Sequence, residues 1–286
     1  MRNRISALSR CLGPCALLAV VGPASAQTDI ARWSFTAVEA APYNTPPAST
    51  DLTSASATQL GMTNGYNGGN TASCDVLNVG GNPDPLGVAA GNNAWRIRGT
   101  TNNGWALAAP QYTQGAEFDV STVGFSGILL SFDFYCTTQG IRDLQVQYNT
   151  NTANSAGWTN FQGSFAGNVA TEKDTSNDTE LIATSNGWNT ASANVTRNTI
   201  DFTANGISGA DNDANFGIRL VSAYQPGLTD GNGNPTYGGA AGGIYNNTSG
   251  NWRFDQVAIQ GTPAPEPASL AAISLGVLAL IRKRRK

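Results

Sequence analysis

Hydrophobic and polar positions alternate along much of this chain, most regularly over residues 128–136. There Leu130, Phe132, Phe134 and Cys136 fall on one face, and mostly polar side chains fall on the other. Side chains of a β-strand point alternately to its two faces, so this pattern predicts a strand with one face in a hydrophobic core.

Similar runs recur along the chain, separated by stretches rich in Gly, Asn, Asp and Pro. They cover residues 31–35, 74–79, 94–98, 116–120, 142–149, 158–165, 180–184, 199–203, 215–222 and 252–260. Residues 142–149 follow soon after residues 128–136, and we expect the two strands to form a hairpin. No stretch has a convincing helical period. The pattern predicts an all-β fold, a jelly roll or β-sandwich of two packed antiparallel sheets.

The last of these runs changes phase in its middle. Trp252 and Phe254 occupy even positions, whereas Val257 and Ile259 occupy odd ones. An extra residue in the strand restores the alternation, so we predict a β-bulge near Asp255.

The N-terminus has the parts of a secretory signal peptide. Three arginines precede an apolar run over residues 11–21, and the small residues Ala24, Ser25 and Ala26 follow. The run is shorter than the roughly 20 residues that span a bilayer. We therefore assign residues 1–26 to a signal peptide, in preference to a buried N-terminal helix.

The C-terminus is the most specific feature of the sequence. Pro265, Glu266 and Pro267 precede an apolar run over residues 270–281 and five consecutive basic residues at 282–286. Residues 263–286 thus resemble the PEP-CTERM sorting signal. The resemblance implies transient membrane insertion, processing by an exosortase-type enzyme, and envelope attachment or release. The alternative, an ordinary tail anchor, requires a longer apolar run.

Residues 27–262 remain as one predicted extracellular β-domain, and its charge restricts its partners. This region has a net formal charge of −10, because half of the basic residues but only one of the acidic residues lie in the two terminal segments. An acidic surface repels a phosphate backbone, so nucleic acid is not an expected partner. Divalent cations, which an acidic surface attracts, are expected partners.

The chain contains no histidine. This excludes Ser-His-Asp and Cys-His nucleophilic sites, histidine-ligated zinc and histidine general bases. A glycoside hydrolase needs only two carboxylates, but no spacing here singles out a pair. We therefore expect a protein that is not an enzyme.

The order of the β-rich runs is similar to that of carbohydrate-binding jelly-roll modules, and the run at residues 252–259 is the best match. In such modules an aspartate at the place of Asp255 helps to hold a structural calcium ion, here with Glu39 as a candidate partner. Asp211 and Asp213 form a second oxygen-rich turn that suits calcium. An ordinary strand or turn aspartate is the alternative for each.

Three tryptophans lie beside Gly and Asn and are candidates for stacking on sugar rings: Trp105, Trp158 and Trp188. Their alternative role is to cap the edges of the sandwich. Cys74 and Cys136 are the cysteines that remain after signal cleavage, and oxidising conditions outside the cell favour a disulfide between them. Two buried thiols are the alternative.

From these features we consider three possible functions, in order of preference. The first is a non-enzymatic protein of the cell surface or extracellular matrix, associated with exopolysaccharide, because the sorting-signal family is linked to exopolysaccharide-producing bacteria. The second is a carbohydrate-binding module with a defined glycan site. The third is a secreted glycoside hydrolase, which requires a cleft with two carboxylates.

Overall fold

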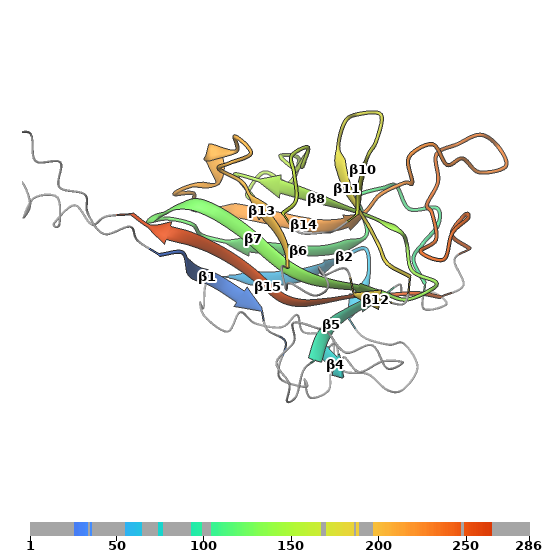
Figure 1. Ribbon diagram of the computed structural model, residues 1–286, viewed down its shortest axis with the longest axis horizontal. Coiled ribbons are helices and arrows are strands. Elements are labelled where there is room, and N and C mark those ends of the chain that lie inside the picture. The colour runs from blue at the N-terminus through green and yellow to red at the C-terminus, as the bar shows by residue number, and fades with distance from the viewer. Residues whose placement is uncertain are drawn as a thin grey trace, which may run out of the picture.

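The computed structural model describes residues 26–33, 35, 55–64, 74–76, 93–98, 104–166, 170–185, 187–188, 197–246 and 249–264. Within them the fold is all-β, two antiparallel sheets packed face to face, as the sequence predicts (Figure 1). Residues 1–25 of the predicted signal peptide, Glu39, and residues 265–286 lie outside the described residues.

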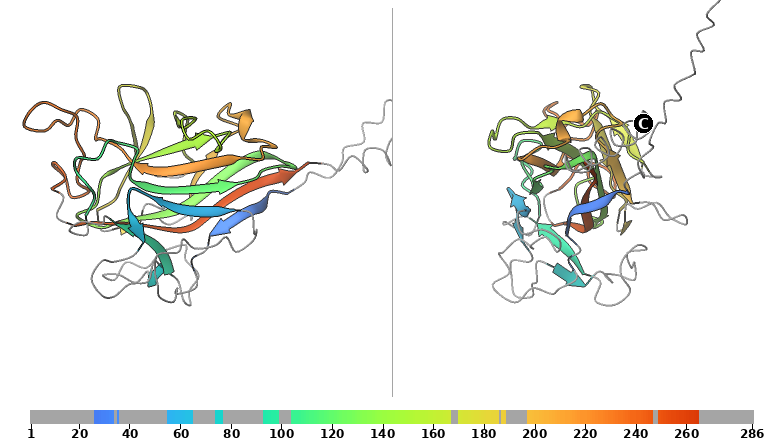
Figure 2. Two further views of the ribbon diagram at one scale, coloured as in Figure 1. Left: turned by 180° about the vertical axis from the view of Figure 1, so that it is seen from behind. Right: turned by 90° about the vertical axis from the view of Figure 1, so that its left-hand side faces the viewer.

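The first sheet has the order β12-β7-β15-β5-β3, while β13 also pairs with β7, β1 with β15, and β4 with β5. Its strands are β1 (Thr28–Trp33), β3 (Thr63–Asn64), β4 (Cys74–Val76), β5 (Asn93–Arg98), β7 (Phe125–Cys136), β12 (Gly187–Trp188), β13 (Asn198–Asp201) and β15 (Trp252–Pro263). The two long strands β7 and β15 lie side by side through the middle of this sheet (Figure 2).

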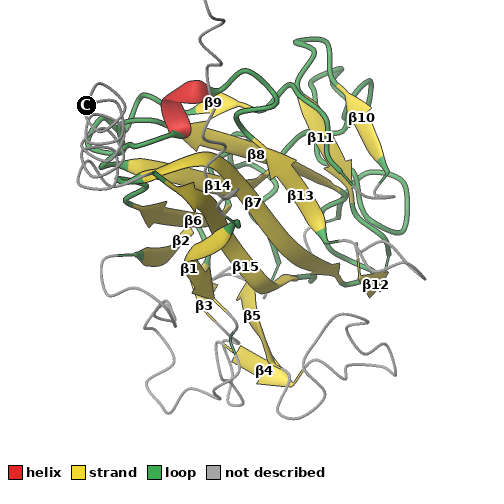
Figure 3. Cartoon of the chain, turned by 60° about the vertical axis from the view of Figure 1, so that its left-hand side comes forward, coloured by secondary structure: helices red, strands yellow, loops and turns green. Residues whose placement is uncertain are grey.

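The second sheet has the order β10-β11-β8-β14-β6-β2, and β9 also pairs with β8. Its strands are β2 (Ser56–Leu60), β6 (Gly115–Val120), β8 (Asp143–Asn149), β9 (Thr159–Asn160), β10 (Thr171–Lys173), β11 (Thr179–Ile182) and β14 (Phe216–Ser222). A single turn of 3-10 helix, η1 (Ser208–Ala210), is the one helical element in the described part of the chain (Figure 3).

Aromatic side chains from both sheets fill the space between them. Trp33 of the first sheet packs edge-on against Phe118 of the second, with ring centroids 5.0 Å apart. Phe134 stacks on Phe254 of the neighbouring strand at 5.7 Å. The alternating apolar residues of β7 are fully buried, which confirms the strand and the face predicted from the sequence.

The predicted hairpin between residues 128–136 and 142–149 is wrong. β7 pairs with β12, β13 and β15, whereas β8 pairs with β9, β11 and β14 in the other sheet. The connection turns sharply at Gly140, whose amide donates to the Thr137 carbonyl at 2.8 Å. A side chain at Gly140 would overlap the Cys136 sulfur. Crossing between sheets lets the apolar faces of β7 and β8 meet across the core.

The predicted β-bulge is confirmed. The register of β15 against β7 shifts between Asp255 and Ala258. Gln256 has a φ of +48°, the backbone conformation that accommodates the extra residue. Trp252, Phe254, Val257 and Ile259 consequently all lie in the core.

The predicted disulfide is also wrong. Cys136 is a buried free thiol, and it donates to the Ile141 carbonyl at 3.4 Å. Cys74 lies opposite Trp95, which lies opposite Phe254, which lies opposite Phe134. Three strand spacings, about 14 Å in all, separate the strand of Cys74 from the strand of Cys136, whereas a disulfide requires Cα atoms within about 7 Å.

Candidate functional site

The outer face of the second sheet carries a row of buried polar side chains. Asp143, Gln145, Gln147 and Asn149 of β8 alternate with core residues and point away from the core, yet all four are buried. Burying polar groups is costly unless they find partners. Their partners therefore indicate what this face is built for.

Carboxylates gather at one end of this row. Glu172 on β10 lies opposite Glu180 on β11, and Glu180 lies opposite Gln145 on β8. Asp143 lies two residues along β8 from Gln145, on the same face. Carboxylate oxygens of Asp143, Glu172 and Glu180, which we call the acidic cluster, lie within 4.8 Å of one another.

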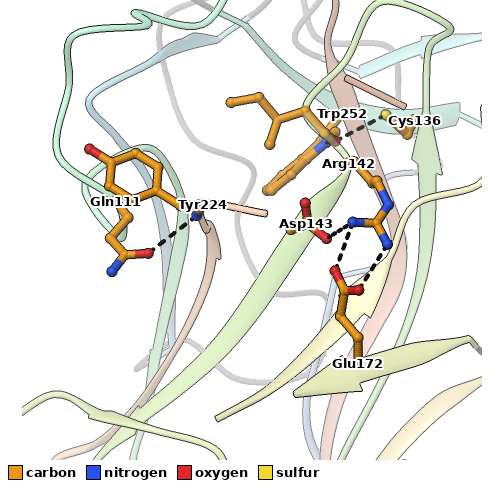
Figure 4. A network of polar contacts seen from close by, with 8 residues as sticks. Gln111, Cys136, Arg142, Asp143, Glu172, Tyr224 and Trp252 are labelled. Carbon is orange, nitrogen blue, oxygen red and sulfur yellow. Dashed lines mark hydrogen bonds and ion pairs between the residues drawn. The ribbon is translucent and has the colours of Figure 1, made fainter. Parts of the chain in front are cut away.

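Arg142 neutralises part of this charge. Its guanidinium donates two hydrogen bonds to Glu172, at 2.7 and 3.0 Å. The same group lies 3.1 Å from an oxygen of Asp143, as Figure 4 shows. Both oxygens of Glu180 are buried and accept no hydrogen bond from the residues that the structure describes. When all three carboxyls are ionised, the acidic cluster has more negative charge than this guanidinium offsets.

Burial in this cluster changes the acidity of its members. It is the largest cause that raises the pKa of Asp143 to about 9, and contact with Glu172 adds to it. Burial also raises the pKa of Glu180 to about 8, together with the nearby charge of Asp174. For Glu172, burial acts in the same direction, but hydrogen bonds to Asp143 and Arg142 outweigh it and lower the pKa.

A neutral hydrogen-bonding network continues along the sheet from the acidic cluster. Gln147 donates to Asn160 at 2.8 Å, and Asn160 donates to Asp178 at 2.6 Å. Asn160 also hydrogen-bonds the side chain of Tyr112, whose pKa is raised by burial and by the charge of Glu180. Asn160 therefore connects the buried row to the edge of the sheet.

At this edge lies a hollow of about 420 Å³, which we call the β9 hollow. It is lined by Tyr148, Thr159, Asn160, Gln162, Gly163, Asn205, Gly206 and Ile207. The lining offers hydroxyl and amide groups and includes no charged residue. This combination suits an uncharged polar ligand.

The three candidate stacking tryptophans lie apart from one another. Trp105 is fully buried against Trp252, with ring centroids 4.3 Å apart, so its predicted role in sugar stacking is wrong. Trp158 is half-buried, and the Arg219 guanidinium lies over its ring, 3.9 Å from the ring centroid. Trp188 is half-buried on β12 of the first sheet and packs against Tyr135. Stacking by Trp158 and Trp188 stays a prediction.

The predicted calcium ligands do not form a group in the described part of the chain. Asp255 is fully buried at the bulge, where its side chain accepts from the Gln256 amide at 2.7 Å. Asp211 accepts from Thr203 at 3.0 Å, and Asp213 from the Asn215 amide at 2.8 Å. These are turn and bulge hydrogen bonds. Calcium at these positions stays a prediction.

The sequence contains one indication of the acidic cluster that our interpretation of the pattern did not use. Asp, Gln, Gln and Asn alternate with Leu, Val and Tyr over β8, which marks one outer face. The remaining members come from β10 and β11, of three and four residues, which are too short to assign by alternation.

Comparison with known proteins supports the assignment of the C-terminus. The PEP-CTERM protein-sorting motif matches residues 263–286, which confirms the predicted sorting signal. The motif indicates an exported protein and implies processing by an exosortase-type enzyme. In the described residues, no helix has the length and apolar character needed to cross a membrane.

No curated protein sequence matches the chain significantly. A search of solved structures finds TmCBM27, a carbohydrate-binding module studied for specific mannan recognition. The two chains are 9% identical with a TM-score of 0.32, and the match covers 83% of this chain and 99% of the other.

Proposed function

We propose that this protein is a non-enzymatic glycan-binding protein of the bacterial cell surface, associated with exopolysaccharide, and that it holds glycan in the β9 hollow. The observation that carries the proposal is the lining of the hollow, which has several hydrogen-bonding side chains and no charged one. The sorting motif supports a location outside the cell, where exopolysaccharide lies.

A neutral sugar needs the chemistry that the hollow offers. Sugar hydroxyls both donate and accept hydrogen bonds, and the amides of Asn160, Gln162 and Asn205 do both as well. The volume falls in the range of ordinary ligand sites. The Tyr148 ring adds an aromatic surface of the kind that a sugar ring covers.

The hollow is held in shape by its own contacts. Gln162 donates to Asp178 at 2.9 Å, and Asn205 accepts from the Ser164 amide at 3.1 Å and donates to the Asp201 carbonyl at 2.7 Å. A site whose polar groups are already oriented loses less conformational entropy when a ligand binds.

The burial of the acidic cluster argues for a protein that binds glycan and against one that hydrolyses it. Hydrolysis of a glycan needs two carboxylates that reach the scissile bond. Asp143 and Glu180 have no exposed surface, so a polymer cannot reach them. A chain without histidine also lacks the most common general base.

Affinity electrophoresis of the exported protein tests this proposal, with native gels that contain the exopolysaccharide of the host or a panel of neutral glycans. We expect retardation of the wild type. The double variant Gln162→Ala, Asn205→Ala removes two hydrogen-bonding groups of about 1 kcal/mol each, and should lose about tenfold or more in affinity.

Gln139→Ala is the matched control, because Gln139 is an exposed glutamine in the turn between β7 and β8. It should bind as the wild type does. Equal retardation of the double variant and the wild type would place the glycan elsewhere. No retardation of the wild type in any gel would refute glycan binding.

A further inference from the structure

The acidic cluster has the geometry of a cation site that is independent of the β9 hollow. Its members stand on three adjacent strands, β8, β11 and β10, and their backbone positions are therefore set by the hydrogen bonds of the sheet. Figure 3 shows these strands side by side at one edge of the second sheet. The oxygens converge because of the register, and a cation would find them already assembled.

Two of the three carboxylates have buried oxygens that accept no hydrogen bond from the described residues. Glu180 has no exposed surface, and both of its oxygens lack a hydrogen-bond donor among the described residues. The oxygens of Asp143 likewise accept no hydrogen bond in the described part of the chain, although Arg142 lies 3.1 Å away. Buried carboxylates without donors are costly unless a cation or a proton compensates them.

The balance of charge favours a divalent ion. With its members ionised, the acidic cluster has three negative charges and Arg142 one positive charge. A single divalent cation makes the whole group neutral, whereas a monovalent cation leaves it negative.

From this arrangement we propose that Asp143, Glu172 and Glu180 bind one calcium ion. The donors are all oxygens, which hard cations prefer. Calcium binds oxygen at about 2.3–2.6 Å, so ligands on opposite sides of it lie up to about 5 Å apart. The mutual spacing of up to 4.8 Å fits one such sphere.

Gln145 supplies a fourth oxygen. It lies directly opposite Glu180, and its buried Oε1 accepts no hydrogen bond from the described residues. Its amide nitrogen is held by the Phe161 carbonyl at 3.1 Å. Calcium enters beside Glu172, whose side chain is 26% exposed, and competes with Arg142 for that carboxylate.

Thermal unfolding and isothermal titration of the full chain with calcium chloride or with EDTA test the proposal. Calcium should raise the melting temperature of the wild type, since it binds the folded state alone. Glu180→Gln should lose at least tenfold in calcium affinity. In EDTA this variant should melt no lower than the wild type, because it replaces a buried ionisable group by a neutral one of similar size, so loss of binding is separable from misfolding.

Glu117→Gln is the matched control, since Glu117 pairs with Arg219 at 2.6 Å on the same face of the sheet but outside the acidic cluster. It should retain the full calcium shift. The proposal is overturned if calcium leaves the wild type unchanged, if Glu180→Gln keeps its affinity, or if Asp255→Asn alone abolishes the shift. An equal shift with magnesium chloride would overturn the assignment to calcium.

Discussion

Raising the pH from 6 to 8 should destabilise the protein in the presence of a chelator. Asp143 and Glu180 have folded-state pKa values of about 9 and about 8, against about 4 in an unfolded chain. Between pH 6 and 8 the folded state therefore holds protons that the unfolded state has lost. Stability then falls as the pH rises, by about 1.4 kcal/mol per pH unit for each carboxyl that is still protonated in the folded state.

Together the two carboxyls lower the free energy of unfolding by up to about 3 kcal/mol per pH unit near pH 6–7. This slope becomes smaller as the pH approaches the pKa of Glu180. Domains of this kind have a total stability of about 5–15 kcal/mol, so the effect is large. The range from pH 6 to 8 is suitable for this measurement because the chain has no histidine that would titrate within it. The raised pKa of Asp119, about 6, acts mainly below this range.

Urea unfolding followed by tryptophan fluorescence, in EDTA at pH 6, 7 and 8, measures this slope. Asp143→Asn and Glu180→Gln should each reduce it by about half, since each removes one late-ionising group, whereas Glu117→Gln should leave it unchanged. A flat wild-type profile between pH 6 and 8 would refute the reasoning.

Three further predictions concern other parts of the molecule. Truncation of a core ring by Phe134→Ala should cost about 3–5 kcal/mol in urea unfolding, whereas Val123→Ala, at an exposed position, should change stability by less than about 0.5 kcal/mol; equal effects would contradict the packing. Non-reducing peptide mapping should find Cys136 as a free thiol that reacts with iodoacetamide only after denaturation, and a peptide linked to Cys74 would contradict the strand order. Intact-mass analysis from the native host should show loss of the signal peptide and of the tail beyond Pro265, Glu266 and Pro267, and a mature species that keeps residues 282–286 would contradict sorting by the C-terminal motif.

Local alternation predicted the longer strands and the bulge at Asp255, because both depend on neighbouring residues, but it missed the shorter strands β2, β3, β10 and β12. It did not predict which strands pair. A hairpin and a crossing between two sheets need similar turn residues, and the choice at Gly140 depends on how the faces of β7 and β8 meet across the core.

The acidic cluster was hidden for the same reason. Glu172 and Glu180 are separated from Asp143 by long stretches of chain, and only the register of two very short strands brings them together. Trp105 shows the opposite error. Its neighbours Asn103 and Gly104 are typical of an exposed loop, but burial of the ring against Trp252 outweighs that local preference.

The position of β15 has a mechanical consequence for a protein sorted by its C-terminus. This twelve-residue strand ends at Pro263, the first residue of the sorting motif, and it is held by β7 along one side and by β1 and β5 along the other. Antiparallel hydrogen bonds run perpendicular to the strands. Tension applied at Pro263 therefore acts along β15 and loads these bonds together in shear, so the sandwich resists being pulled apart from the end that carries the sorting motif.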